Sequence, residues 1–444
     1  MSFVVHRVAK SAARYTDAGG REKCGLCRFF VAPRSCGKVI GPVSPMGWCK
    51  YFSRQMVSQF GGSIFTGGPS LSLDFMTPGS LDPRITFTRA STATYTDASG
   101  TIQTAAVNAP RWDYDPVTHA LRGLLIEEAR TNLLIWTGDL NNAVWAKFAN
   151  IAAAPVTLAN QAIAPNGTLT AASITYPAVS GGGAYSAQYQ GITGTAVPYT
   201  ASIWLRGSVG GEQTYIEITD NATYYVSPRL TLTTQWQRFS VTSPALTVTA
   251  WYLIIGTDLR GSQTSTPAQT IYAWGAQVEQ GAFPTSYIPT TAAAVTRAAD
   301  VATMPFTPAA SGTYQAEFVP NGVAASLPVI ISGNAGSPVM SLGADSRLVA
   351  SIKGGASVFS AIAPAMTFGA VNKTAFGYLT GGSKAAVNGA TLGANAVALT
   401  VTGTSIEFGS DGVTPGNNAL NGTLRRVTYW PRVLSDAEMQ QVTT

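Results

Sequence analysis

The sequence predicts a mainly β protein in which a small cysteine-rich module precedes two β-sandwich domains. Three observations indicate this fold class. Only 11% of the 444 residues are charged and 45% are hydrophobic, whereas charged residues make up about 25% of ordinary soluble domains. The 45 glycines and 25 prolines suit short strands and tight turns rather than long helices. All four cysteines lie between residues 24 and 49.

Residues 1–60 form the predicted N-terminal module. They contain ten Lys and Arg against two Asp and Glu, so the overall charge of +6 comes from this segment. We expect this basic module to dock on acidic neighbouring proteins. The rest of the chain lacks the basic stripes with interleaved aromatic residues that indicate a nucleic-acid partner.

The chain carries no apolar run of about 18 residues, so we expect no insertion into a membrane. Residues 1–15 contain Arg7, Lys10 and Arg14 in place of the uninterrupted apolar core of a signal peptide. We therefore expect synthesis in a cytoplasm.

The four cysteines have the spacing Cys24-x2-Cys27-x8-Cys36-x12-Cys49. Two disulfides would require an oxidising compartment, and no export signal is seen. Four thiolates that converge on one centre can organise a segment too small for its own core, and zinc and iron–sulfur centres both accept them. Aromatic and glycine residues beside the cysteines favour a cluster, with zinc as the alternative.

This segment resembles the high-potential iron–sulfur proteins, through CGLCRF at residues 24–29, Cys36, and GWCKYF at residues 47–52. The resemblance implies one [4Fe–4S] cluster held by Cys24, Cys27, Cys36 and Cys49. The interval between the second and third cysteines is shorter than is usual in that family. Because the rest of the chain shows no flavin, haem or nucleotide motif, we interpret the cluster as structural rather than as an electron carrier.

Residues 61–148 are predicted to be a linker and a β-rich connecting segment. The linker, residues 61–72, is rich in Gly, Ser and Pro. Thr-rich alternation over residues 84–95 then indicates strands.

Residues 149–303 are predicted to be a β-sandwich, because short strands recur about every ten residues. The clearest alternation is at residues 199–206, 213–219, 235–242, 250–255 and 270–279. Strict alternation in the last of these predicts two faces: Tyr272, Trp274, Ala276 and Val278 on one, Gln277 and Glu279 on the other.

Residues 304–444 form the last predicted β-rich domain. Near its end, Ser435 and Glu438 have the spacing of a helix capping box, so we expect a short terminal helix.

The body resembles phage tail-fibre and head-spike proteins. The resemblance is carried by ITFTRASTATY at 85–95, IEEARTNLL at 126–134, GAFPTSYIPT at 281–290 and TRAAD at 296–300. Residues 149–303 resemble carbohydrate-binding modules. Residues 304–444 resemble a concanavalin- or laminin-G-type jelly roll, through AVNG at 386–389 and LRRVTYW at 424–430. These resemblances imply a virion-surface protein, made in the host cytoplasm, that binds a bacterial glycan or builds the particle.

Aromatic side chains are the candidate glycan contacts, because their faces stack on the C–H surfaces of sugar rings. The candidates are Trp204, Tyr224, Tyr225, Trp251 and Trp430, with Tyr215 and Tyr252 weighed beside them. The alternative for each is the core, since half of the positions on a sandwich strand face inward.

We predict no catalytic residues. A glycosidase needs two facing carboxylates, but Glu127 and Glu128 are adjacent and would point to opposite faces of a strand. Asp113 and Asp115 belong to a turn-like stretch, and no Gly-x-Ser-x-Gly motif accompanies the two histidines. We expect Glu127 to form an ion pair with Arg130.

The hypothesis is a phage tail fibre or head spike, anchored to other virion proteins by its N-terminal module and recognising host-surface polysaccharide through its sandwiches. A symmetric homo-oligomer such as a trimer is expected, because repeated weak sites gain avidity. The alternatives are a cement or decoration protein of the capsid or tail without a ligand, and a polysaccharide-degrading glycosidase.

Overall fold

The computed structural model describes residues 67–444, apart from 221, 247–249, 259–264, 323–327, 356 and 412–417, together with β1 (Phe30–Val31) and β2 (Ser35–Cys36). The chain divides into two compact units, Met1–Gly67 and Gly68–Thr444. In the first unit β1 and β2 pair antiparallel, with Phe30 opposite Cys36. Cys24, Cys27 and Cys49 lie outside the described residues, so the [4Fe–4S] cluster and its zinc alternative stay predictions.

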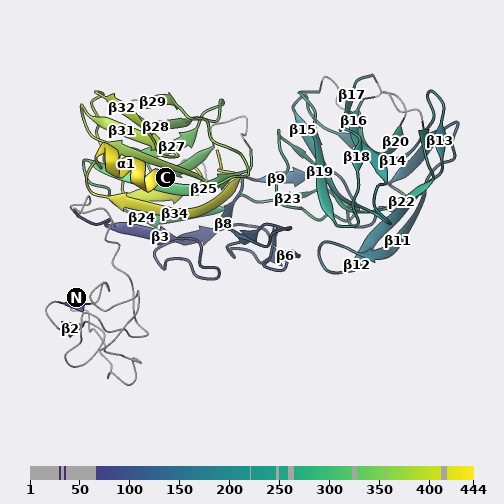
Figure 1. The fold of residues 1–444 in the computed structure, drawn as a ribbon, viewed down its shortest axis with the longest axis horizontal. Coiled ribbons are helices and arrows are strands. Elements are labelled where there is room, and N and C mark those ends of the chain that lie inside the picture. Colours follow the sequence, from purple (N-terminus) through teal and green to yellow (C-terminus); the bar gives the residue numbers. More distant parts are fainter. Residues whose placement is uncertain are drawn as a thin grey trace. The chain divides into compact units, whose positions relative to one another are not determined.

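The second unit is built almost entirely of antiparallel strands, and its described part contains one short helix, α1 (Asp436–Thr443). Two β-sandwiches can be followed in Figure 1, one of them containing the segment between β10 and β22 and the other the C-terminal strands. The predicted mainly β fold class is therefore confirmed. In the part of the chain that is described, no helix has the length and apolar character needed to cross a membrane.

The first sandwich packs a six-stranded sheet against a five-stranded sheet. The six-stranded sheet runs β10 (Ala146–Asn150), β14 (Tyr185–Thr193), β20 (Ala250–Asp258), β16 (Gln213–Thr219) and β17 (Tyr224–Val226), with β18 (Leu230–Thr231) beside β16. The five-stranded sheet runs β11 (Val156–Ile163), β12 (Leu169–Tyr176), β22 (Gln269–Gln280), β15 (Tyr199–Gly207) and β19 (Gln237–Thr242). The strands predicted from alternation are all present.

The core of the first sandwich lies between these sheets. Alternate residues of β16 and β20 point inward, among them Ile216, Ile218, Leu253 and Ile255, which are buried in one apolar cluster. Residues between them face the other way, because side chains alternate along a strand. Each sheet of this sandwich therefore also has an outer face, away from the core.

The second sandwich packs a seven-stranded sheet against an eight-stranded one. The first runs β29 (Ser357–Ile362), β28 (Leu348–Ile352), β27 (Pro338–Leu342), β26 (Val329–Ser332), β33 (Ser405–Phe408), β24 (Val301–Pro305) and β4 (Thr86–Thr88). The second runs β32 (Ala390–Asn395), β31 (Ser383–Val387), β30 (Asn372–Tyr378), β25 (Gly312–Pro320), β34 (Gly422–Trp430), β8 (Leu121–Ile126) and β7 (Trp112–Tyr114), with β3 (Leu71–Asp74) also pairing β34.

The second sandwich is discontinuous in sequence, which differs from the predicted division into 61–148, 149–303 and 304–444. Strands β3, β4, β7 and β8 come from the segment expected to be a connector, yet they pair with C-terminal strands. The reason is burial: Leu71, Leu73, Leu124 and Ile126 lie in the same apolar core as the C-terminal strands. The first sandwich is inserted between these two parts.

Three two-stranded sheets complete the described strands. They are β5 (Ala93–Thr96) with β6 (Ile102–Ala105), β9 (Arg130–Asn132) with β23 (Val295–Arg297), and β13 (Val179–Ser180) with β21 (Ser265–Thr266). The second of these pairs the segment entering the first sandwich with the segment leaving it.

The predicted terminal helix is confirmed together with its capping box. The Ser435 side chain accepts from the Glu438 amide, and the Glu438 carboxylate accepts from the Ser435 amide at 2.8 Å. The guanidinium of Arg432 also donates to both oxygens of Glu438, at 2.9 and 2.7 Å. The helix packs on β30, β31 and β32.

A β-bulge in β22 overturns the predicted faces of that strand. The register with β15 passes from Ser202 opposite Gln277 to Trp204 opposite Trp274, and Gly275 between them has φ +66°. The extra residue reverses the alternation. As a result Ala276 and Val278 lie in the core, whereas Tyr272 and Trp274 belong to a cluster on the outer face together with Trp204.

We expect Gly275→Ala to destabilise the first sandwich by about 2 kcal/mol. The position needs a left-handed backbone, and a Cβ there would lie 2.9 Å from the Trp204 ring. Urea denaturation followed by tryptophan fluorescence measures the change. Gly182→Ala is the matched control, because a Cβ at Gly182 meets nothing within 4 Å. Equal effects of the two substitutions would contradict this account of the bulge.

Candidate functional site

The outer face of the six-stranded sheet carries a row of aromatic side chains. Tyr185 and Tyr189 are on β14, Phe148 is on the neighbouring strand β10, and Tyr252 is on β20 opposite Gly191. Their sequence neighbours point to the core: Trp251, next to Tyr252, is fully buried there. Alternation thus places the four rings together on the side away from the core.

The four rings are in contact. Ring centroids are 5.1 Å apart for Phe148 and Tyr185, 5.3 Å for Phe148 and Tyr189, and 5.4 Å for Tyr189 and Tyr252. Each of the four side chains is half-buried. We call this set, Phe148, Tyr185, Tyr189 and Tyr252, the aromatic face.

Small and polar residues continue the same side of the sheet. Ala187 on β14 lies opposite Gly256 on β20, which in turn lies opposite Tyr215 on β16. Tyr215 is 3% exposed, and its hydroxyl has no hydrogen-bond partner within the described ranges. Two residues further along β16 is the buried carboxylate of Glu217. Both polar side chains are buried, so the groups that this surface offers to a ligand are the four half-buried rings.

Two of the predicted glycan contacts are wrong because their rings are enclosed. Trp251 is 0% exposed and packs on Tyr199 at a centroid distance of 4.6 Å. Trp430 is 6% exposed and lies in a small apolar cluster with Leu434 and Met439 of the C-terminal segment. Neither ring presents a face to a ligand.

The other three predicted contacts have different surroundings. Tyr224 on β17 is 42% exposed and lies opposite Thr219, which is opposite Tyr252. Tyr225 is half-buried against the core. Trp204 is on the outer face of the other sheet, where the Arg238 guanidinium lies 4.4 Å from its ring centroid. Of the three, Tyr224 is thus on the same side of the sheet as the aromatic face.

Sequence reasoning missed Phe148, Tyr185 and Tyr189, although Tyr252 was weighed. A signal was present: Tyr185 and Tyr189 are four residues apart, so they share a face on a strand. Which face points outward depends on the pairing of β14 with β10 and β20, which alternation in one strand does not fix.

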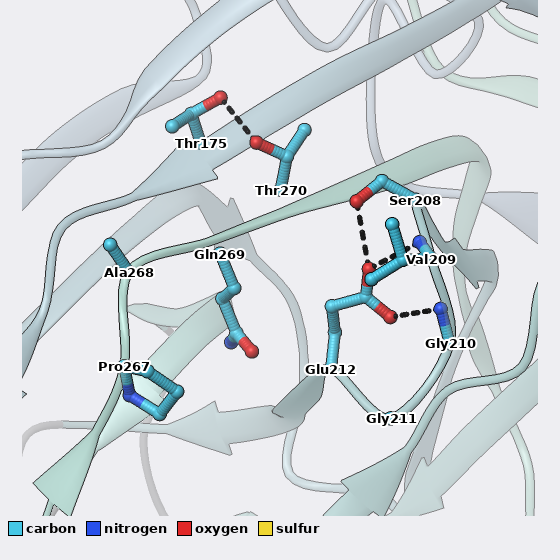
Figure 2. Close-up of a pocket in the computed structure, with 10 residues that line it drawn as sticks. All are labelled: Thr175, Ser208, Val209, Gly210, Gly211, Glu212, Pro267, Ala268, Gln269 and Thr270. Carbon is cyan, nitrogen blue, oxygen red and sulfur yellow. Dashed lines mark hydrogen bonds between the residues drawn. The ribbon is translucent and has the colours of Figure 1, made fainter.

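A separate cavity of about 470 Å³ lies at one end of the first sandwich (Figure 2). It is lined by polar and small residues: Thr175, Gln269, Thr270, Pro267, Ala268 and residues 208–212. The Glu212 carboxylate holds the loop that forms one wall, accepting from Ser208 Oγ and from the amides of Val209 and Gly210, each at 2.8 Å. Burial raises the pKa of Glu212, but these hydrogen bonds outweigh it and leave the pKa below its ordinary value.

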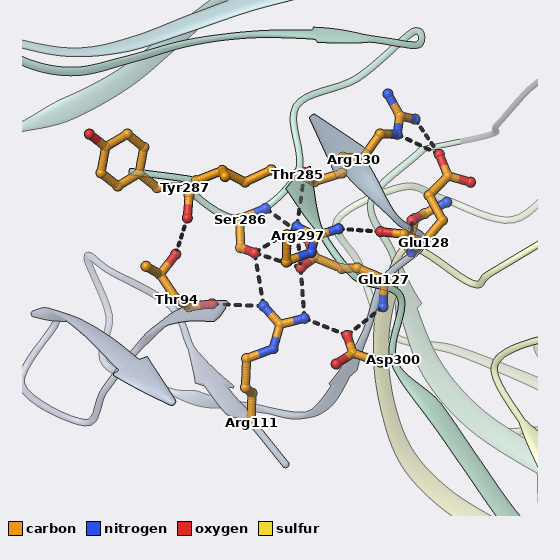
Figure 3. A network of polar contacts seen from close by, with 12 residues as sticks. Thr94, Arg111, Glu127, Glu128, Arg130, Thr285, Ser286, Tyr287, Arg297 and Asp300 are labelled. Carbon is orange, nitrogen blue, oxygen red and sulfur yellow. Dashed lines mark hydrogen bonds and ion pairs between the residues drawn. The ribbon is translucent and has the colours of Figure 1, made fainter. Parts of the chain in front are cut away.

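A buried network of ion pairs lies where the chain passes between the two sandwiches (Figure 3). Asp300, just before β24, accepts from Arg89 at 3.0 Å and from Arg111. Glu127, just after β8, pairs with Arg111 and with Arg297, both at 2.9 Å. All five side chains are at most 2% exposed.

The Glu127 carboxylate is fully engaged in this network. It accepts from the Ser286 amide at 2.7 Å and from Ser286 Oγ at 2.6 Å, in addition to its two arginines. Burial raises the pKa of Glu127, but the charges of Arg297 and Arg111 outweigh burial and bring the pKa to about 2. The carboxylate is therefore an ionised structural group enclosed by protein.

The predicted pair between Glu127 and Arg130 is wrong. Arg130 pairs instead with Glu128, at 2.5 Å, because both side chains point away from the network that holds Glu127 (Figure 3). The opposite orientation of the two adjacent glutamates is as predicted.

No model of a known protein family matches the chain. A 44-residue stretch of the N-terminal segment is 46% identical to an iron oxidase from Acidithiobacillus ferrooxidans, covering 10% of this chain and 49% of the iron oxidase. The chain thus spans about half the length of this curated relative.

Solved structures with some likeness include domain 4 of the arabinanase AbnA from Geobacillus stearothermophilus in complex with arabinotriose, at 12% identity and TM-score 0.28, over 37% of this chain and 82% of that one. TmCBM61 in complex with β-1,4-galactotriose follows at 11% identity and TM-score 0.25, over 34% and 98%. Trypanosoma rangeli sialidase in complex with sialic acid has 10% identity and TM-score 0.26, over 64% and 61%. These TM-scores support no inference about function.

We expect Glu127→Gln to lower the free energy of unfolding by about 3–5 kcal/mol at neutral pH, because it leaves buried arginine charges underpaired. The pKa of Glu127 is lowered by folding, so its ionised form stabilises the protein above the ordinary pKa of 4.5 and this contribution is lost as the pH falls towards about 2. The difference from the unmodified protein should shrink over the same range in urea denaturation.

Glu128→Gln is the control for this prediction. Its carboxylate is 19% exposed and pairs with one arginine, so we expect a loss of about 1 kcal/mol. A Glu127→Gln effect that does not change between pH 7 and pH 3, or that equals the Glu128→Gln effect, contradicts the structural role of the network.

Proposed function

We propose that this protein recognises glycans through the aromatic face of its first sandwich. The observation that carries the proposal is the row of four touching rings on a sheet side turned away from the core, with centroids 5.1–5.4 Å apart. An outer sheet face needs no aromatic row for folding, since the core lies on the other side. Such rings bind the apolar surfaces of sugars, and polar neighbours bind their hydroxyls.

The candidate contacts extend beyond the four rings. Tyr224, on the same side of the sheet and 42% exposed, extends the surface beyond the aromatic face.

We further propose that the chain is a virion-surface protein of a bacteriophage, a tail fibre or head spike whose ligand is a host-surface polysaccharide. The support is the resemblance of four sequence stretches, from residue 85 to residue 300, to such proteins. In this proposal the basic N-terminal module attaches to other virion proteins, and a homo-oligomer such as a trimer multiplies weak sites.

The proposed N-terminal centre is a [4Fe–4S] cluster bound by Cys24, Cys27, Cys36 and Cys49, with zinc as the alternative. Its support is the set of four thiolates, which suits iron–sulfur centres, and the 46% identity over 44 residues to an iron oxidase. When bound, the cluster would hold the four cysteines of this small segment at one point and so stabilise its fold.

We propose binding without hydrolysis. The adjacent pair Glu127 and Glu128 offers no facing carboxylates, because Glu127 is enclosed by Arg111, Arg297 and Ser286 while Glu128 pairs with Arg130. Release of reducing ends from a bound polysaccharide would favour the glycosidase alternative, and absence of any glycan binding would favour a cement role.

Tyr252→Ala and Tyr189→Ala should each weaken glycan binding by about fivefold, since one aromatic contact contributes about 1 kcal/mol. Isothermal titration against β-1,4-galactotriose, arabinotriose and purified polysaccharide of the host bacterium measures this. The control is Tyr95→Ala, a half-buried tyrosine on β5 outside the sandwich. If neither Tyr252→Ala nor Tyr189→Ala changes the affinity for any of these glycans, the proposed site is overturned.

The full-length protein, purified under anaerobic conditions, should be brown and contain about four iron and four sulfide per chain if a [4Fe–4S] cluster is present. Cys24→Ser should abolish the visible absorbance, whereas Ser35→Ala should leave it. Stoichiometric zinc without iron, by elemental analysis, establishes the alternative instead.

A further inference from the structure

The outer face of the five-stranded sheet, opposite the aromatic face, carries a second ordered set of side chains. Thr175 lies opposite Thr270, and one row along the same face Tyr272 lies opposite Arg206. Successive residues on one face are about 7 Å apart along a strand. The Tyr272 and Arg206 row therefore adjoins the hydroxyl-lined cavity of Figure 2.

Arg206 is held between two aromatic rings. Its guanidinium carbon lies 4.7 Å from the ring centroid of Tyr272 and 5.2 Å from that of Trp236. The Trp236 indole is fixed in turn by donating to the Ile163 carbonyl at 2.9 Å. Such stacking orients the planar guanidinium without neutralising its charge.

The charge of Arg206 has no carboxylate partner among the described residues. Among the described residues, Arg206 forms one hydrogen bond, from Nη1 to the Thr234 carbonyl at 3.4 Å. Its buried Nε forms none with these residues. The arginines of the buried network differ, because Arg89, Arg111 and Arg297 each pair with Asp300 or Glu127. A half-buried, pre-oriented guanidinium of this kind suits a carboxylate ligand.

The adjoining cavity supplies the complementary part of a site. The hydroxyls of Thr175 and Thr270 are 3.0 Å apart and face solvent, and the cavity volume of about 470 Å³ can hold a sugar residue. The ionised Glu212 in its wall disfavours a second anion there, so a ligand's carboxylate belongs at the Arg206 end and its neutral hydroxyls at the cavity end.

We propose that this face is a second glycan site, specific for acidic saccharides, in which Arg206 binds the carboxylate of a uronic or sialic acid and the cavity binds neighbouring hydroxyls. The proposal rests on the proposed function, glycan recognition by this sandwich, but uses residues on the opposite sheet. A saccharide is favoured over an acidic peptide because the face offers one cation, Arg206, stacked on aromatic rings and next to the threonine hydroxyls of the cavity.

The test compares acidic and neutral oligosaccharides on the full-length protein by isothermal titration. Trigalacturonate, triguluronate and sialyl-lactose are the acidic probes, and β-1,4-galactotriose is the neutral one. Arg206→Met, which keeps the aliphatic stem, should weaken binding of at least one acidic probe tenfold or more and leave galactotriose unchanged. Arg206→Lys should recover part of the loss, and raising the salt concentration should weaken acidic binding.

Two controls keep this test separate from the proposed function. Arg347→Met removes a half-exposed arginine of the second sandwich. It should change neither the affinity for the acidic probes nor the affinity for galactotriose. Tyr252→Ala should weaken galactotriose and spare the acidic probes. Binding of galactotriose without any acidic probe overturns the second site alone. Binding of acidic probes that depends on Arg206, with no affinity for any glycan changed by Tyr252→Ala or Tyr189→Ala, overturns the aromatic face alone. Equal binding of hexaglutamate at Arg206 also overturns the saccharide assignment.

Discussion

The structure depends on a buried cluster of opposite charges. Asp300 and Glu127 are enclosed together with three arginines. Guanidinium groups surround both carboxylates, and the Ser286 amide and hydroxyl also donate to Glu127. Removing one partner would leave the others uncompensated, so the segments that carry them must meet in one arrangement. Those segments adjoin β4, β7, β8 and β24 of the second sandwich, and Arg297 lies in β23. The network thus fixes how the strands before the first sandwich join those after it.

Much of the strand pattern could be predicted because alternation is a local property. The strands at β15, β16, β19, β20 and β22 follow directly from it, as does the terminal helix from its capping box. The discontinuity of the second sandwich could not, since the pairing of β34 with β8 and β3 depends on contacts about 300 and about 355 residues apart in sequence. The same limit applies to the ion pairs: the sequence shows two adjacent glutamates, but only the fold shows which one is enclosed.

The candidate binding residues show this limit at the scale of single side chains. Trp251 and Tyr252 are adjacent on β20, so one must face the core and the other away from it. Trp251, one of the predicted glycan contacts, is the buried member of the pair. In β22 the bulge at Gly275 reverses the faces halfway along the strand, which places Tyr272 beside Arg206 rather than on the same side as Ala276.

The interleaved second sandwich has a consequence for biosynthesis. Strand β34 is bordered by β25, β8 and β3, yet it is translated about 300 residues after β8. Strands β3 and β8 therefore lack their partner β34 while the first sandwich is translated and folds. During this time apolar residues such as Leu124 and Ile126 are not covered by the rest of their core. A chaperone that binds nascent chains would act in this interval. A chain released before residue 422 would contain a folded first sandwich and an incomplete second sandwich, whose unpaired strands β25, β8 and β3 are prone to aggregate.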